Sequence, residues 1–304
     1  MAESNNSIAV ISITYNDSFK FNEWCQWYEE YKDQIGLHII VDNGSSKEYL
    51  TKVRSYFKNS VIIERGKNGG CTGAYNDGLK YALSISHIKA IALLGNDIRL
   101  NKCFFDELYK LLFSRDELGM VGAAVLSKDS DVIESYGDTV NSIGIPKTNY
   151  THHKLDDVPQ EMDVSFVGGG CNLAKREFYE KVGLQDENLF MYNDEMDMFY
   201  RAKSMGYKEA VTKRAVAWHQ HIRNSEDEEM SIKMAFLNGR NRIYIIKKHM
   251  DIFRGAAMFI YMFVCETLVF VRDINDKVSR DRYFSKCKGF IAGMIGNMDN
   301  TFLE

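Results

Sequence analysis

The alternation of short β-branched runs with helical patterns over the first part of the chain is the feature that most constrains its fold. Each run is followed by a polar or glycine-containing segment, which is typical of a buried strand that ends in a loop. Strands that alternate with helices favour a parallel, doubly wound sheet. We therefore predict an α/β fold with a mostly parallel sheet flanked by helices. The predicted strands are residues 8–13, 37–41, 61–63 and 91–94, and the predicted helices are residues 21–31 and 74–85.

Polar, small or acidic residues follow all four of these strands. Ligands of such sheets bind beyond the carboxyl ends of the strands. Any one of these segments is also typical of a simple turn, because Asn, Asp and Gly are common turn residues. Four in succession at one edge of a sheet favour a ligand site. The segments are Thr14-Tyr15-Asn16, Asp42, Asn68-Gly69-Gly70 and Asn96-Asp97.

The second half of the chain has a different pattern. Residues 128–162 are polar and irregular, and we predict a loop region there. Residues 164–167 read as a strand that runs into Gly168-Gly169-Gly170, where a glycine backbone either approaches a ligand closely or makes a flexible turn. We predict a helix over residues 175–182, and helices from His219 to the end of the chain.

The sequence Asn193-Asp194-Glu195-Met196-Asp197 is a compact acidic cluster. If a helix begins near Asp194, the carboxylates occupy its first turn, where the helix dipole stabilises negative charge. Simple capping of the helix is one interpretation. The other is that one carboxylate is a general base that faces a cleft.

Taken in order, these motifs resemble the family 2 glycosyltransferases of GT-A fold, particularly the bacterial rhamnosyl-, galactosyl- and galactofuranosyltransferase-like members. The resemblance covers residues 8–250 and rests on the order of the motifs, since each motif alone is weak. It implies a Rossmann-like GT-A sheet. The matching segments are residues 11–16 (ISITYN), 41–46 (VDNGSS), 68–78 (NGGCTGAYNDG), 94–97 (LGND), 194–207 (DEMD…R…GY), 218–219 (WH), and 240–242 (RNR) with 247–249 (KKH).

The resemblance assigns roles to individual residues. Asp97 would hold a divalent cation, Mn²⁺ or Mg²⁺, on the donor diphosphate, with His219 as a second ligand and His221 as the competing candidate. The residues implied to bind the nucleotide are Thr14, Tyr15, Asn16, Asp42, Asn68, Gly69, Asn76 and Asn96, and those implied to bind the sugar or acceptor are Gly168, Gly169 and Trp218.

Two departures from the family pattern affect the candidate chemistry. The metal motif Gly95-Asn96-Asp97 keeps only one acid, and the acidic motif reads Asp-Glu where Glu-Asp is commoner. Alignment on Asp197 and Arg201 places Glu195 at the position of the catalytic base, with Asp194 as the alternative. Asp197 and Arg201 are expected to orient this helix rather than to react.

The implied activity is inverting transfer of a sugar from a UDP- or dTDP-linked donor to a hydroxyl of a glycan or lipid-linked acceptor in cell-surface polysaccharide synthesis. A non-catalytic relative that binds the nucleotide sugar is the alternative. A dehydrogenase is a weaker rival, because the first strand-to-helix turn lacks the GxGxxG expected for a dinucleotide.

We predict a catalytic domain over residues 1–235, with a nucleotide-sugar-binding half (1–127) and an acceptor half (128–235), followed by a helical segment over 236–304. The net charge of −4 argues against nucleic-acid binding, although residues 240–290 carry 11 Lys and Arg against 5 Asp and Glu. The apolar run 256–271 contains Glu266 and is short for a membrane span. It is either a core or homodimer-interface helix, or an in-plane anchor on anionic lipid.

The six cysteines are scattered without a CxxC pair, which argues against a zinc site and a disulfide framework. The polar N-terminus does not resemble a secretory signal. We therefore expect a cytoplasmic protein, peripheral on the cytoplasmic face of the membrane if the apolar run is an anchor.

Overall fold

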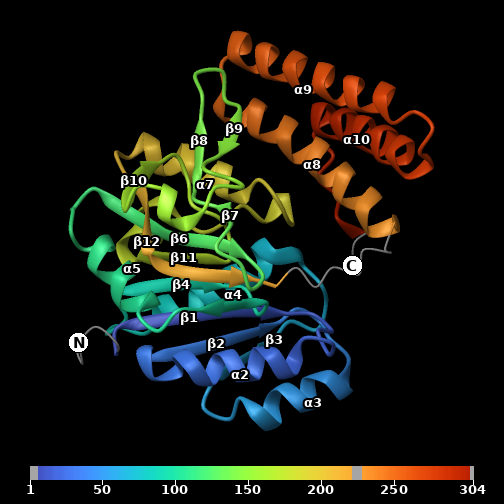
Figure 1. Ribbon diagram of the computed structural model, residues 1–304. Helices are drawn as coiled ribbons and strands as arrows, with labels where there is room; N and C mark the ends of the chain where they lie inside the picture. The colour runs from blue at the N-terminus through green and yellow to red at the C-terminus, as the bar shows by residue number, and fades with distance from the viewer. Residues whose placement is uncertain (1–5, 221–227, 302–304) are drawn as a thin grey trace.

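The computed structural model describes residues 6–220 and 228–301 (Figure 1). The strands are β1 (Ile8–Thr14), β2 (Leu37–Asp42), β3 (Val61–Glu64), β4 (Ala90–Leu94), β5 (Ile98–Leu100), β6 (Leu118–Ser127), β7 (Ile133–Ser135), β8 (Asp138–Val140), β9 (Pro146–Thr148), β10 (Glu161–Val164), β11 (Cys171–Lys175) and β12 (Lys208–His219). The α-helices are α2 (Phe21–Tyr31), α3 (Lys47–Tyr56), α4 (Gly70–Ser84), α5 (Phe104–Leu112), α6 (Arg176–Val182), α7 (Asp194–Ser204), α8 (Glu228–His249), α9 (Ile252–Arg272) and α10 (Lys277–Ile295).

One large sheet organises the chain, in the strand order β10-β12-β6-β11-β4-β1-β2-β3. Strands β3, β2, β1 and β4 are parallel, and β6 and β12 run in the same direction beyond them. Strand β11 is antiparallel to both β4 and β6. The predicted α/β fold with a mostly parallel sheet is confirmed, and the carboxyl ends of the parallel strands share one edge.

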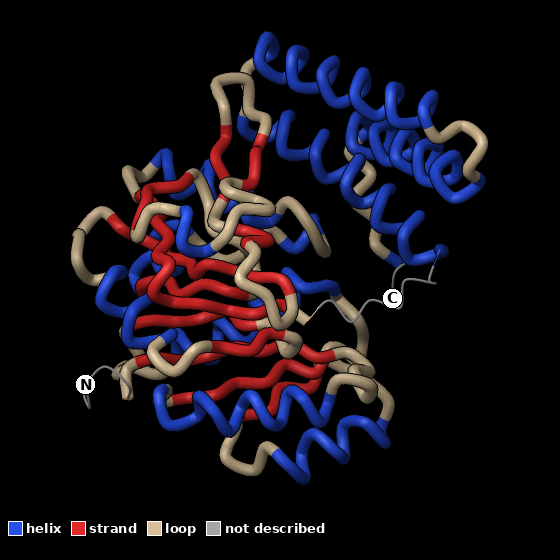
Figure 2. The backbone as a smooth tube through the Cα atoms, in the orientation of Figure 1, coloured by secondary structure: helices blue, strands red, loops and turns tan. Residues whose placement is uncertain are grey.

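Helices cover both faces of this sheet (Figure 2). Successive residues of β1 point to opposite faces, so that Ile8 and Val10 pack with α2, α3 and α5, whereas Ala9 and Ile11 pack with α4, α6 and α7. Because both faces of β1 are buried, apolar residues follow one another along the strand instead of alternating with polar ones.

The predicted C-terminal helices are α8, α9 and α10, which lie together to one side of the sheet (Figure 1). Glycines allow α8 and α10 to approach closely: a Cβ at Gly289 would lie 2.2 Å from the carbonyl oxygen of Phe236. A small apolar cluster around Leu189, Met196, Ile245 and Met258 joins α8 and α9 to the segment before α7 and to α7 itself. The predicted domain boundary between residues 235 and 236 falls inside α8. The division of the chain into two domains at that point stays a prediction.

The structure corrects several details of the sequence-based assignment. Residues 128–162 are not simply irregular, because they contain β7, β8, β9 and the start of β10. The strand predicted over 164–167 ends at Val164, and Phe166 instead makes an isolated bridge to Asp138. Helix α4 begins at Gly70, four positions before the predicted start at Ala74.

Candidate active site

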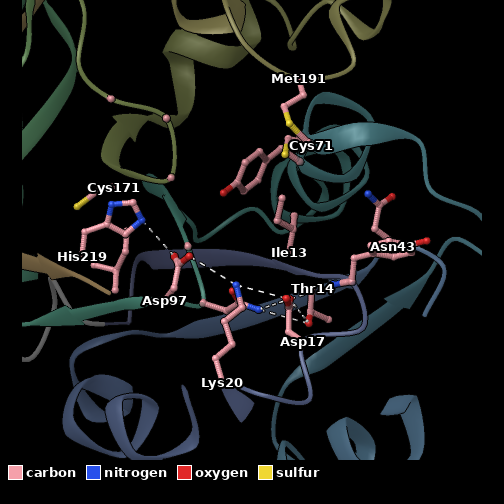
Figure 3. Close-up of a pocket in the computed structure, with 18 of the residues that line it drawn as sticks. Ile13, Thr14, Asp17, Lys20, Asn43, Cys71, Asp97, Cys171, Met191 and His219 are labelled. Carbon is pink, nitrogen blue, oxygen red and sulfur yellow. Dashed lines mark hydrogen bonds and ion pairs between the residues drawn. The ribbon is translucent and has the colours of Figure 1, made fainter. Parts of the chain in front are cut away.

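A cavity of about 870 Å³ opens at the edge of the sheet where the parallel strands end (Figure 3). Loops after β1, β2, β3 and β4 contribute to its wall, and so do the glycine turn before β11 and the end of β12. Side chains from the first turns of α8 complete it. The polar or glycine residues of the wall include Thr14, Tyr15, Asp17, Lys20, Asn43, Asn68, Gly70, Asn96, Asp97, Glu134, Ser135, Gly168, Gly169, Gly170, Ser231 and His219.

Thr14 and Asn96 are joined at the base of the cavity by a third residue, Asp17. Oδ2 of Asp17 accepts hydrogen bonds from the hydroxyl of Thr14 at 3.0 Å and from the amide of Asn96 at 2.8 Å. The amide of Asn96 also lies 3.3 Å from the hydroxyl oxygen of Thr14. Thr14 and Asn96 are buried, so this network fixes the relative positions of the loops after β1 and β4.

Asp97 and His219 come together because β5 pairs antiparallel with the end of β12. Nε2 of His219 lies 3.8 Å from Oδ1 of Asp97, and Nδ1 lies 3.2 Å from Oε1 of Glu134. Burial works to lower the pKa of His219, but hydrogen bonds and charge from Asp97 and Glu134 outweigh it and raise the pKa to about 9. Burial works to raise the pKa of Asp97, yet His219 and Lys20 hold it below its ordinary value. The pair is therefore ionised at neutral pH.

Lys20 brings a second positive charge to the same carboxylate. Its Nζ lies 3.5 Å from Oδ2 of Asp97 and 3.4 Å from Oδ1 of Asp17 (Figure 3). Within residues 6–220 and 228–301, no three His, Cys, Asp or Glu side chains are grouped so that they could hold a metal ion by themselves. Asp97 and His219 fit a cation that completes its coordination with phosphate oxygens, on condition that His219 releases its proton.

The glycine turn connects the cavity to the acidic helix α7. The backbone N–H of Gly169 donates a hydrogen bond of 3.1 Å to Oε1 of Glu195. Gly169 lines the large cavity, whereas Glu195 and Asp194 line a small space behind the turn. A Cβ at Gly169 would lie 2.4 Å from Oε1 of Glu195, so only glycine allows this approach without movement.

The carboxylates behind the glycine turn are held in a poorly solvated environment. Burial raises the pKa of Glu195, and burial together with the charge of Glu195 raises the pKa of Asp194. Glu209 on β12 is also buried there; its Oε2 accepts a hydrogen bond of 2.9 Å from the N–H of Val167, and burial raises its pKa to about 8. A carboxyl group with a raised pKa, in this position, is suited to accept a proton near neutral pH.

Asp197 on α7 is fully buried and surrounded by positive charge. It accepts from Nε of Arg201 at 2.8 Å, and contacts Nζ of Lys248 at 2.8 Å and Nε2 of His249 at 2.7 Å. Although burial opposes it, hydrogen bonds from His249 and Lys248 and the charges of Arg201 and Lys248 hold the pKa of Asp197 well below its usual range. Arg201 also donates to the carbonyls of residues 182 and 184. The network ties α7 to α8 and to the end of α6.

Comparisons with known proteins agree with this geometry. Residues 38–183 match the family model described as glycosyl transferase family 2. A curated relative from Haloferax volcanii, the low-salt glycan biosynthesis hexosyltransferase Agl10, is 26% identical over 176 residues. The alignment covers 56% of this chain and 54% of Agl10, so it spans about half the length of that relative. These matches support a family 2 glycosyltransferase, with the family model covering residues 38–183.

Two solved structures show that this chain has the GT-A fold. The crystal structure of GalNAc-T7 with UDP, GalNAc and Mn²⁺ has a TM-score of 0.67 at 14% identity, covering 95% of this chain and 56% of that one. The mannosyltransferase PcManGT from Pyrobaculum calidifontis, in complex with GDP-Man and Mn²⁺, has a TM-score of 0.58 at 15% identity. That similarity covers 96% of this chain and 87% of PcManGT.

Within this GT-A fold, many of the predicted site residues meet at the large cavity. They are Thr14, Tyr15, Asn68, Asn96, Asp97, Gly168, Gly169 and His219. Glu195 reaches the cavity wall through Gly169, and Asp194 lies beside it in the smaller space. His221 lies outside the described residues.

Other predicted residues support the loops of the cavity rather than line it. Asn16 accepts from the N–H of Ser46 at 2.9 Å, and Gly69 donates to Oδ1 of Asn43 at 3.1 Å. The amide of Asn76 makes three hydrogen bonds to Gln185 and Glu187, so we leave Asn76 out of the nucleotide site. The indole N–H of Trp218 donates to the carbonyl of Ser130, and the alternation of β12 turns Trp218 away from the cavity that His219 faces. We leave Trp218 out of the sugar site for that reason.

Asp42 is buried beside the cavity wall with half of its carboxylate unpaired. Oδ2 accepts from the N–H groups of Gly44 and Ser45, at 3.3 and 3.1 Å. Oδ1 is buried and has no hydrogen-bond partner among the described residues. An unpaired buried acceptor costs free energy, which a ligand donor would recover.

Sequence reasoning missed several residues of the site. Asp17 and Lys20 follow β1 closely, but neither belongs to a motif that the family resemblance singles out. Glu134 lies in the segment that was predicted to be irregular. Glu209 is an acidic residue of a strand that was not predicted, and no local signal marks it.

Proposed function

We propose that this chain is an inverting, metal-dependent glycosyltransferase that moves a sugar from a nucleoside-diphosphate sugar to an acceptor hydroxyl. One observation carries the proposal: a single cavity joins the nucleotide-side loops, the Asp97–His219 pair and the glycine turn that holds Glu195. These are the three parts that such a transfer needs, because the donor must be bound, its leaving diphosphate neutralised and the acceptor hydroxyl deprotonated.

The nucleotide would bind against the loops after β1, β2 and β3. The unpaired Oδ1 of Asp42 would accept a hydrogen bond from the base or ribose. Tyr15, Asn43 and Asn68 line the same side of the cavity and would contact the nucleoside. UDP and dTDP are the proposed donor nucleotides, and GDP is a third candidate, because PcManGT was solved with GDP-Man.

Asp97 and His219 would hold the divalent cation, either Mn²⁺ or Mg²⁺. Both GalNAc-T7 and PcManGT were solved with Mn²⁺, which supports a cation in a fold of this kind. When bound, the ion offsets the negative charge on the diphosphate leaving group. Lys20 lies 3.5 Å from Asp97 and would add a fixed positive charge on the same side of the cavity.

Glu195 would remove the proton from the acceptor hydroxyl. Its raised pKa makes it a better proton acceptor than an ordinary carboxylate, and Gly169 directs Oε1 toward the cavity wall. Attack of the acceptor oxygen on the face of the sugar opposite the diphosphate inverts the anomeric centre. Asp194 is the alternative base, and Asp197 with Arg201 would only orient the helix.

The proposed acceptor is a glycan or lipid-linked saccharide used in cell-surface polysaccharide synthesis, on the cytoplasmic face of the membrane. Agl10, a relative over about half its length, is named for glycan biosynthesis. Helix α9 is the one described helix that is long and apolar enough to cross a membrane, with a mean hydropathy of 1.6 and 11% of its apolar window buried. That helix would contact lipid or a second subunit.

A thermal-shift screen tests the nucleotide and metal sites. UDP, dTDP, GDP and NAD are each added with and without Mn²⁺, to wild type and to Asp97→Ala. We expect a manganese-dependent rise in Tm with one nucleoside diphosphate, lost in Asp97→Ala, because a ligand at about 100 times its Kd stabilises the native state by about 2.7 kcal/mol. A shift with NAD alone, or with none of the four, would refute the proposal.

Turnover of the donor tests catalysis separately from binding. Glu195→Gln should lower kcat by about 10²–10⁴-fold while the nucleotide-dependent rise in Tm persists. If wild type binds the nucleotide but neither hydrolyses nor transfers the sugar, and Glu195→Gln changes nothing, the chain is a non-catalytic relative that binds the nucleotide sugar. A loss in Asp194→Asn larger than in Glu195→Gln would assign the base to Asp194.

A further inference from the structure

The three C-terminal helices enclose a second cavity of about 500 Å³. It is distinct from the cavity at the edge of the sheet, and its wall is rich in hydroxyl, amide and charged side chains. None of the motifs that carry the family resemblance accounts for it. Its polar wall residues include Ser231, Asn238, Glu266, Arg272, Asp273, Ser279, Arg282, Tyr283 and Lys286.

The charges of this wall favour an anionic ligand. Lys286 is paired with Glu266, and Arg272 with Asp273. The guanidinium of Arg282 forms no ion pair or hydrogen bond with any residue of 6–220 or 228–301, so it is the cation available to a ligand. A guanidinium binds phosphate through paired N–H donors. The surrounding residues 240–290 carry 11 Lys and Arg against 5 Asp and Glu, which attracts anions to this part of the molecule.

The second cavity meets the first at α8. Ser231 and Met234, one helical turn apart, belong to the walls of both cavities. The two cavities are therefore neighbours that share part of their walls. An acceptor bound by its anionic group at α10 can place a neighbouring sugar toward Gly169 and the Asp97–His219 pair.

Helix α9 offers a place for a hydrocarbon chain next to the second cavity. Val269 and Phe270 form part of the cavity wall. On the same helix, Ile260 is 60% exposed and Leu268 is 64% exposed, although both are large aliphatic residues. Apolar side chains left uncovered over a whole helix mark a surface that meets lipid or another apolar partner.

We propose that the cavity between α8, α9 and α10 binds the phosphate group of a lipid-linked saccharide acceptor, with the lipid chain against α9. This inference rests on the proposed function, since it identifies the acceptor of that reaction. A second copy of the chain would cover α9, but it would not use the available guanidinium of Arg282 or the polar cavity that shares Ser231 and Met234 with the donor cavity. A phosphate-bearing lipid uses both, and also matches the basic charge of this part of the chain.

Vesicle flotation of the full chain tests the proposal. Phosphatidylcholine vesicles carry either a long-chain isoprenoid monophosphate or phosphatidylglycerol, adjusted to the same surface potential. Wild type should bind the isoprenoid phosphate vesicles about ten-fold more tightly, which is the size expected for a charged hydrogen bond. Arg282→Ala should abolish this preference. Lys288→Ala is the matched control, because it removes the same charge from an exposed position of α10 that does not line the cavity.

The result distinguishes a phosphate site from a merely basic surface. Equal binding to both vesicles, or a preference that Arg282→Ala retains, would overturn the proposal, as would a stable dimer that binds neither vesicle. The nucleotide-dependent rise in Tm is measured on the same samples and should persist in Arg282→Ala. Failure of that rise in wild type refutes the glycosyltransferase function, whereas failure of the lipid preference alone refutes only the acceptor site.

Discussion

The backbone N–H of Gly169 and the carboxylate of Glu195 are 3.1 Å apart, and this bond connects the donor cavity to the acidic helix α7. Gly169 lines the cavity, and Glu195 lies behind it. The turn therefore forms part of the cavity wall and also fixes the position of the proposed base. The absence of a side chain at Gly169 is what lets the two residues approach.

Gly169→Ala should disable the proposed base without damaging the nucleotide site. The added Cβ would lie 2.4 Å from Oε1 of Glu195, so the carboxylate or the turn must move. We expect kcat to fall by roughly 10²-fold, as for displacement of a general base, with little change in the KM for the donor. Steady-state kinetics over a range of donor concentrations measure both quantities.

Gly168→Ala is the matched comparison for this substitution. A Cβ at Gly168 meets no heavy atom within 4 Å, although Gly168 lines the same cavity. The decrease in kcat for Gly168→Ala should be roughly ten-fold smaller than the decrease for Gly169→Ala. Equal losses would mean that any side chain in the turn blocks the site and that Glu195 is not involved.

The acid side of the pH–rate profile should report on Glu195. A general base works deprotonated, so activity is lost as the pH falls through its pKa. Burial raises the pKa of Glu195, and the charge of Asp138 adds to this, so the loss should begin at a higher pH than for an ordinary glutamate. Asp138→Asn should shift the acid limb of kcat to lower pH, because the neighbouring negative charge is removed.

An exposed aspartate provides the control for this shift. Asp156→Asn removes the same charge from the surface and should leave the acid limb in place. The amide at residue 138 can still accept the hydrogen bond of 2.8 Å from Thr148, which protects the local structure. An unchanged profile in Asp138→Asn would indicate that another group controls the acid limb.

The nucleotide half of the fold could be predicted because each signal there is local. Strand β1 is a continuous apolar run, and the loops after β1 and β4 contain Thr14, Asn96 and Asp97 within a few residues of the strand ends. In a parallel sheet, these ends must lie at one edge. Short-range pattern was therefore enough to bring the cavity residues together.

Strands β6 and β12 were missed because their sequences carry weak β signals. Strand β6 contains Gly119, Gly122 and two alanines, and its burial on both faces, rather than propensity, makes it a strand. Strand β12 is interrupted by Lys213 and Arg214, where the register with β6 shifts between Thr212 and Val216. Without these strands, Glu209 could not be derived from sequence, and only the family resemblance implied that His219 lies near Asp97.

Asp197→Asn should destabilise the fold strongly, because Asp197 compensates buried positive charge from α7 and α8. Removing one partner of a buried ion pair costs about 3–5 kcal/mol. Chemical denaturation at neutral pH measures the loss of unfolding free energy. Glu177→Gln, which breaks the exposed Lys181–Glu177 pair, should cost about 0.5 kcal/mol or less.

The effect of Asp197→Asn should also depend on pH in a defined direction. The pKa of Asp197 is depressed in the folded state. Its ionised carboxylate therefore contributes its full stabilisation of the fold at pH values above about 3.9, the pKa of an aspartate in the unfolded chain. As the pH falls below that value, the contribution declines and the two proteins should converge in stability. A difference that stays constant down to acid pH would show that packing, not charge, holds Asp197.

Asn241 should prove to be the residue that couples the C-terminal helices to the cavity. It is fully buried, and its amide donates to the carbonyls of Leu189, Met191 and Tyr192 at 2.8, 2.8 and 3.0 Å. Asn241→Asp keeps the shape but removes the donor, so a carboxylate would face carbonyl oxygens. We expect at least about 3 kcal/mol of lost unfolding free energy, more than for a neutral hydrogen bond.

Because Met191 lines the donor cavity, the nucleotide-dependent rise in Tm should shrink in Asn241→Asp as well. Asn238→Asp on the same helix is the control. The side-chain amide of Asn238 donates to the carbonyl of Met234, and its oxygen accepts a hydrogen bond of 3.5 Å from the amide of Asn193. Equal losses in the two variants would mean that a negative charge on α8, rather than the Asn241 amide, disturbs the fold.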